Sequence, residues 1–135
     1  MSAALLALKP EERDGITTPR EAFCEAWLES VIYIERQTGR TGLFGIYPDI
    51  ATRLDNVKSH RALPPAIGRI KSIINRITRK DATFLCLLVS FHNAKNAEAL
   101  CKQRRQSIKL TDLTSLGPKQ KTLYLRLLTN HTRWA

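Results

Sequence analysis

The ten residues from Ala82 to Phe91 constrain the fold of this chain most, because only Thr83 and Ser90 interrupt their apolar character. Ten helical residues cover about half of the hydrocarbon core of a bilayer, so the run is too short to cross a membrane. A helix that is apolar nearly all round is typical of one that neighbouring elements bury. We therefore expect a central buried helix at about 82–92, capped by Asp81, and no membrane partner.

A second strong signal marks where the first long helix begins. Thr18-Pro19-Arg20-Glu21 combines a capping threonine, a proline at the first helical position and a glutamate three residues after the cap. Phe23 and the apolar residues after it recur at helical spacing, and Gly39 provides a left-handed stop after Thr38. The sequence predicts a helix over about 19–38.

Prolines and turn residues divide the remaining chain into further helices. One begins near Pro48, and another follows Pro64-Pro65 and extends towards Lys80. Further helices are expected at about 94–105 after a turn at Asn93, as a short turn at 111–116, and from Pro118 onwards. The apolar positions that should face the core of these helices are Ile67, Ile70, Ile74, Ile77, Ala97, Leu100, Cys101, Leu123, Leu127 and Leu128.

These segments together predict an all-α protein. No segment alternates convincingly between apolar and polar residues, so a sheet is not expected. At 135 residues the chain is long enough for one core. We expect a loosely ordered leader at 1–17 and a single compact domain at 18–135, in which five or six helices surround the helix at about 82–92.

The charge of the chain is divided unevenly along its length. Residues 1–36 carry seven acids and four bases, for a net charge of −3, whereas residues 37–135 carry eighteen bases and five acids, for a net charge of +13. The sum is the overall +10. A surplus of this size favours a polyanionic partner, because each phosphate neutralised by Lys or Arg releases counterions.

Three clusters of cations are the candidate phosphate contacts. Arg69, Arg76 and Lys80 have the spacing of one helical face, a second cluster ends the helix at 94–105, and a third shares a face of the last helix. The complete predicted set is Arg69, Arg76, Lys80, Lys102, Arg104, Arg105, Lys119 and Arg126. The competing interpretation is a solvated charged surface, in which cations near helix C-termini stabilise the helix dipoles.

Two classes of function remain open for such a chain. The first is a non-enzymatic protein that binds nucleic acid, DNA or RNA, or a ribonucleoprotein, mainly through phosphates. The alternative is a protein-binding inhibitor, adaptor or assembly subunit of a larger complex, which would use the acidic stripe Glu21, Glu25 and Glu29. The segregation of charge also allows a homo-oligomer through head-to-tail contacts.

The sequence carries no motif that predicts catalysis, a cofactor or a metal centre. HExxH and GxSxG are absent, as is any CxxC. An odd count of three cysteines favours a reducing compartment such as the cytoplasm. Cys86 and Cys101 lie seven and eight residues from Asn93, so an antiparallel hairpin would bring them face to face. Buried reduced thiols are the preferred interpretation, with a disulfide or a metal as alternatives.

Overall fold

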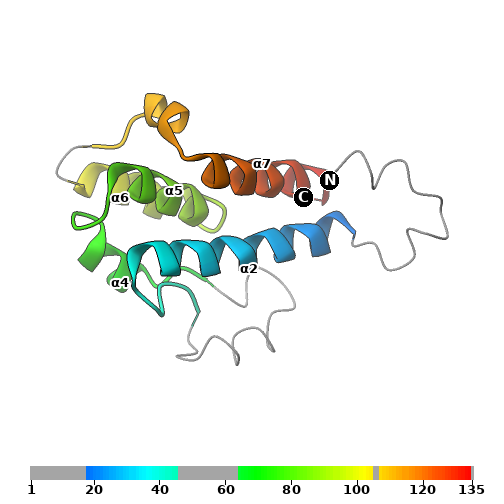
Figure 1. The fold of residues 1–135 in the computed structure, drawn as a ribbon, viewed down its shortest axis with the longest axis horizontal. Helices are drawn as coiled ribbons and strands as arrows, with labels where there is room; N and C mark the ends of the chain where they lie inside the picture. The colour runs from blue at the N-terminus through cyan, green and yellow to red at the C-terminus, as the bar shows by residue number, and fades with distance from the viewer. Residues whose placement is uncertain (1–17, 46–63, 105–106, 135) are drawn as a thin grey trace.

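The fold is built around one antiparallel pair of long helices and one helical hairpin. In this computed structural model, which describes residues 18–45, 64–104 and 107–134, the helices are α2 (Pro19–Thr38), α4 (Ile67–Ile73), α5 (Arg79–Ser90), α6 (Ala94–Gln103), the 3₁₀ helix η3 (Leu110–Ser115) and α7 (Pro118–Trp134). Figure 1 shows α2 and α7 side by side with opposite directions, and α4, α5 and α6 gathered towards one end. The predicted all-α class is confirmed.

The bounds of α2 follow the local signals at its two ends. The Thr18 hydroxyl oxygen accepts a hydrogen bond from the Glu21 amide at 3.2 Å, and the Glu21 carboxylate accepts one from that hydroxyl at 3.2 Å. Gly39 ends the helix at φ 67°, a conformation that glycine adopts without the steric cost a side chain brings. The prediction of a helix at 19–38 is confirmed.

Helix α5 has the central position that its composition predicts. It contacts α2, α6, η3 and α7, and its Phe84, Leu85 and Leu88 are fully buried. Aromatic side chains of α2 complete the core: Trp27 packs edge to face on Phe44 with ring centroids 5.5 Å apart, and Tyr33 packs in the same way on Phe84 at 5.7 Å. One strip of α5 that includes Leu87 and Ser90 is only partly covered.

The predicted helix from Pro64-Pro65 towards Lys80 is wrong in its extent. Helix α4 ends at Ile73, and a turn precedes Thr78, which is extended at φ −63° and ψ 158°. The Thr78 hydroxyl oxygen accepts a hydrogen bond from the Asp81 amide at 3.2 Å. Thr78 therefore caps α5, in place of the predicted Asp81, and the chain changes direction between the two helices.

Two further expectations about helices need correction. Helix α6 ends at Gln103, two residues before the predicted Arg105, because Arg104 is already extended at ψ 136°. Leu128, predicted to face the core, is 40% exposed, whereas Leu123 and Leu127 are fully buried. The leader at 1–17, the helix near Pro48 and Arg105 lie outside the described residues.

A short backbone contact fastens the loop after α2 to the start of α4. Phe44 and Pro65 form an isolated antiparallel bridge, and the Ala66 amide donates to the Leu43 carbonyl at 2.8 Å. The buried Glu35 carboxylate accepts a hydrogen bond from the Leu43 amide at 2.9 Å. This contact holds α4 beside the C-terminal end of α2. No helix in the described part of the chain has the length and apolar character needed to cross a bilayer.

Candidate polyanion interface

The first predicted cluster of cations does not occupy one helical face. Arg69 lies on α4, Arg76 lies in the turn after it, and Lys80 lies in the first turn of α5. All three residues are exposed. The Arg69 guanidinium packs over Gly42, and a Cβ at that position would require the arginine side chain to move. The expected shared face is wrong because α4 ends at Ile73, before Arg76, and Lys80 belongs to a separate helix that Thr78 begins.

Tertiary contacts nevertheless bring basic segments together at one end of the molecule. The Gln103 side-chain amide at the end of α6 donates to the Lys71 carbonyl on α4 at 3.3 Å. The neighbouring Arg104 guanidinium donates to the Ile77 carbonyl at 3.2 Å. The C-terminal ends of α4 and α6 therefore meet beside the N-terminal end of α5 (Figure 1). The exposed cations on these segments are Arg69, Lys71, Arg76, Lys80 and Lys102.

The position of Lys80 weakens the interpretation that its charge stabilises a helix dipole. A cation stabilises the dipole at a helix C-terminus, whereas Lys80 lies in the first turn of α5, where the positive end of the dipole lies. Within the described residues, Lys71, Arg76 and Lys80 form no ion pair. The structure thus leaves these three charges available to solvent or to a partner.

Acidic side chains near this end are already engaged inside the fold. Asp112 accepts hydrogen bonds from the Arg79 guanidinium at 2.6 and 2.8 Å and from the Lys109 amide at 2.6 Å. Hydrogen bonding from Arg79, and then from the Lys109 backbone, lowers the pKa of Asp112 to about 2. Asp81 is buried and accepts a hydrogen bond from the Gln120 side chain at 2.9 Å. Because these carboxylates are already hydrogen-bonded inside the fold, they neutralise little of the positive charge of the exposed cations.

The predicted cations of the last helix have a different environment. Lys119 and Arg126 on α7 bind the two carboxylate oxygens of Glu29 on α2, at 2.8 and 2.5 Å. Hydrogen bonds from Lys119 and then Arg126 lower the pKa of Glu29. One residue predicted to bind a protein partner therefore pairs with two residues predicted to bind nucleic acid. Glu21 and Glu25, the other members of the acidic stripe, remain exposed.

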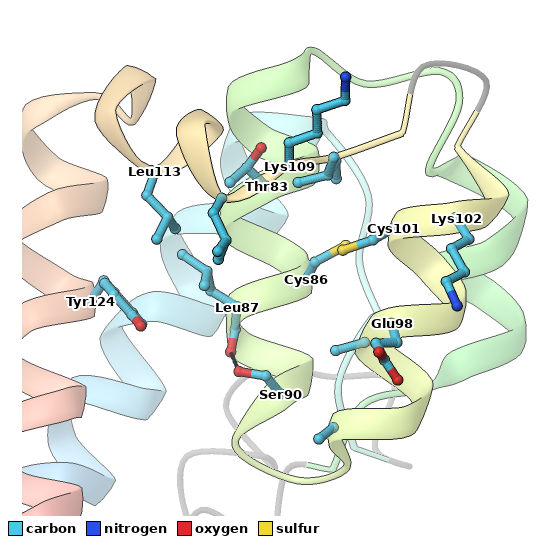
Figure 2. A pocket seen from close by; sticks show the side chains of 14 residues that line it. Thr83, Cys86, Leu87, Ser90, Glu98, Cys101, Lys102, Lys109, Leu113 and Tyr124 are labelled. Atoms are coloured by element: carbon cyan, nitrogen blue, oxygen red, sulfur yellow. Dashed lines mark hydrogen bonds between the residues drawn. The ribbon is translucent and has the colours of Figure 1, made fainter.

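The two cysteines of the helical hairpin face each other as the spacing around Asn93 predicts. Figure 2 shows the Cys86 and Cys101 side chains directed towards one another from α5 and α6. Both are free thiols, and Cys86 is buried while Cys101 is partly exposed. Burial, followed by the proximity of Cys101, raises the pKa of Cys86. Among the described residues, no three His, Cys, Asp or Glu side chains converge as a metal site would require.

An apolar groove between α5, α6 and η3 is a feature that the sequence did not predict. Its walls include Leu87, Ala97 and Leu113, and Tyr124 of α7 also lines it. The local signal for it was the apolar set Ile108, Leu110 and Leu113 in an otherwise polar segment, of which Leu110 is 85% exposed. Comparison of the chain with models of protein families, with curated proteins and with solved structures found no match.

Proposed function

We propose that this protein binds nucleic acid through phosphate contacts at the end where α4, α5 and α6 meet. The observation that carries the proposal is the group of exposed cations Lys71, Arg76 and Lys80, which form no ion pair within the described residues. Arg69 and Lys102 add charge on adjoining segments. Lysine and arginine gain binding free energy from phosphates largely by releasing condensed counterions.

The geometry favours contacts with the phosphate backbone over recognition of bases. The exposed cations come from three short segments, and no single described helix presents a row of base-reading side chains. The aromatic ring of Tyr124 lines the apolar groove and contacts Phe91 with ring centroids 6.1 Å apart. Lys119 and Arg126 contribute less than the sequence suggested, because Glu29 partly neutralises them.

Fluorescence titration of a labelled oligonucleotide at several salt concentrations tests this proposal. Each phosphate contact contributes about 0.7 to the slope of log affinity against log salt for a single strand, and about 0.9 for duplex DNA. The double variant Arg76→Gln with Lys80→Gln should therefore bind more weakly and flatten the slope by about 1.4 to 1.8. Both side chains are exposed, so folding should survive.

A matched variant controls for the overall loss of charge. Lys95→Gln with Lys121→Gln removes the same two charges from exposed positions at the start of α6 and in the first turns of α7. This control should keep the wild-type slope. Equal flattening in both variants would refute the assigned interface, and absence of wild-type binding at low salt would refute nucleic-acid binding.

The alternative function is that of an inhibitor, adaptor or assembly subunit. It relies on the acidic stripe of α2, and the structure leaves less of that stripe exposed than the sequence predicts. The Glu29 carboxylate binds Lys119 and Arg126, which leaves Glu21 and Glu25 as the exposed part of the predicted stripe. Glu21 also accepts a hydrogen bond from the Thr18 hydroxyl at the helix cap. A protein partner therefore finds a smaller acidic surface on α2 than the sequence indicates.

A further inference from the structure

The groove between α5, α6 and η3 is a formed concavity with apolar walls. Its volume is about 480 Å³. Figure 2 shows Leu87 of α5, Leu113 of η3 and Tyr124 of α7 directed towards it, with Lys102 and Lys109 at its edges. A volume of this size lies within the range of about 300–1,000 Å³ that is typical of binding pockets.

Specific contacts hold the walls of the groove in place. Arg79 of α5 binds Asp112 of η3 and also donates to the Ser107 carbonyl at 2.6 Å. Helix α6 packs directly against α5 in the opposite wall, where the Cys86 and Cys101 side chains face each other. Because both sides are fastened to α5, the groove exists before any partner binds, which lowers the entropic cost of binding.

Apolar surface extends beyond the concavity itself. Leu110 lines the rim and is 85% exposed. Leu128 lies one helical turn after Tyr124, on the same face of α7, and is 40% exposed. A small molecule inside the concavity would leave this apolar surface in water. A polypeptide segment that crosses the groove can cover it, and contiguous exposed apolar surface is typical of such interaction sites.

The charges beside the groove indicate the chemistry of that segment. Lys102 and Lys109 line it from α6 and from the residue before η3, and neither forms an ion pair in the described part of the chain. Glu98 is the one carboxylate among the lining residues. The net positive charge complements acidic residues on a partner, which would steer association.

We propose that this groove binds an acidic amphipathic segment of a partner protein. An aliphatic side chain of the segment enters between Leu87 and Leu113 and covers Leu110, while its carboxylates face Lys102 and Lys109. The binding mode is that of an amphipathic helix in an apolar groove. Lys102 adjoins both the groove and the proposed phosphate interface. The proposal nevertheless does not depend on nucleic-acid binding, because the apolar walls of the groove contribute nothing to phosphate contacts.

A fluorescence anisotropy titration of the full chain tests the proposal. The probe is a labelled 16-residue peptide, a length of about four helical turns, with leucines at helical spacing and glutamates at most other positions. We expect saturable binding that weakens about tenfold or more when alanines replace the leucines of the probe, since each buried leucine contributes substantially to affinity. Equal binding of the alanine peptide, or no saturable binding up to about 1 mM, would overturn the proposal.

Variants of the protein locate the binding site. Leu110→Ala should weaken probe binding about tenfold, whereas Leu125→Ala, which changes an exposed leucine outside the groove, should not. Lys102→Gln with Lys109→Gln should weaken binding and reduce its salt dependence, and Arg36→Gln with Arg40→Gln, which changes two exposed cations at the end of α2 away from the groove, should leave it unchanged. The reverse ranking within either pair of variants would overturn the assignment.

Two measurements distinguish peptide binding in the groove from binding at the phosphate interface and from self-association. Arg76→Gln with Lys80→Gln, the variant designed against phosphate contacts, should retain full affinity for the peptide. In the wild-type chain, the peptide should slow alkylation of Cys101, which lines the groove, and leave Cys24 unaffected as the internal reference. Alkylation of Cys101 at the same rate with and without the peptide would overturn the proposal. Self-association that Leu110→Ala abolishes would also overturn it, because a second copy of the chain would then be the occupant of the groove.

Discussion

At the scale of single residues, two carboxylates that are engaged inside the fold add to the positive character of the surface. Asp81 and Asp112 are two of the five acids in residues 37–135, and both are hydrogen-bonded to other side chains within the protein. Asp112 joins η3 to α5 through Arg79, while Asp81 joins α5 to α7 through Gln120. These two acids thus stabilise contacts between helices and are already engaged when the exposed lysines and arginines meet a partner.

The environment of Asp112 predicts a pH-dependent contribution to stability. Its folded pKa of about 2 is below its ordinary value of 3.8, so the ionised form is favoured by folding. The contribution is fully present above about pH 5 and disappears as the pH falls through 3.8 towards 2. Asp112→Asn should therefore lower the free energy of unfolding at pH 7, and the deficit should shrink as the pH is lowered.

Urea denaturation of both proteins between neutral and acidic pH measures this difference. Glu98→Gln is the matched control, because the Glu98 carboxylate forms no hydrogen bond or ion pair within the described residues. It should change stability little at either pH. A deficit of Asp112→Asn that is constant with pH would show that the carboxylate charge does not produce the effect.

At the scale of elements, one threonine separates α4 from α5. The Thr78 hydroxyl oxygen accepts from the Asp81 amide, and the Thr78 carbonyl accepts from the Ala82 amide at 2.8 Å. Threonine followed three residues later by an acid is the pattern that also begins α2. The turn before Thr78 lets Ile73 and Ile74 remain buried while α5 enters the core.

Replacement of this cap should destabilise the protein measurably. Thr78→Ala should cost about 0.5–2 kcal/mol of unfolding free energy, because an amide at the start of α5 loses its acceptor. Thr78→Ser keeps a hydroxyl oxygen and should lose much less. Chemical denaturation with circular dichroism detection compares the two variants. An equal loss from both would attribute the effect to the threonine methyl group instead of the cap.

At the scale of the whole molecule, the first and last described helices are joined by a charge cluster. Glu29 of α2 and Arg126 of α7 are 97 residues apart in the sequence. Phe23 of α2 also packs on His131 of α7, with ring centroids 5.5 Å apart. This pairing brings an acidic region and a basic region of the chain together and cancels part of the charge asymmetry seen in the sequence.

A double-mutant cycle measures how much this long-range pair contributes. Glu29 and Arg126 are partly exposed, with side-chain exposures of 42% and 34%. Solvent screening therefore limits the coupling between Glu29→Ala and Arg126→Ala to about 0.2–1 kcal/mol, and added salt should decrease it. The same cycle with Glu25→Ala, one turn away on α2, should give no coupling. Coupling of equal size from Glu25 would indicate that Arg126 interacts with the general negative charge of α2 and not specifically with Glu29.

The local elements of the fold could be predicted from the sequence because their signals act within one helical turn. Thr18, Pro19 and Gly39 set the ends of α2 through backbone geometry and hydrogen bonds to near neighbours. The apolar run at 82–91 marked α5 as the buried helix because no arrangement could leave it in water at low cost. Thr78, followed three residues later by Asp81, carried a similar local signal for a helix start. The helical spacing of the isoleucines from Ile67 to Ile77 suggested instead that one helix continued through this position.

The partners of charged and apolar side chains depended on the tertiary structure. Nothing near Lys119 or Arg126 in the sequence indicates Glu29, and the exposure of Leu110 and Leu128 depends on which helices pack beside them. Capping is a short-range interaction and can be inferred from adjacent residues. Ion pairing, burial and groove formation depend on distances between segments tens of residues apart, which only the packing of the whole chain determines.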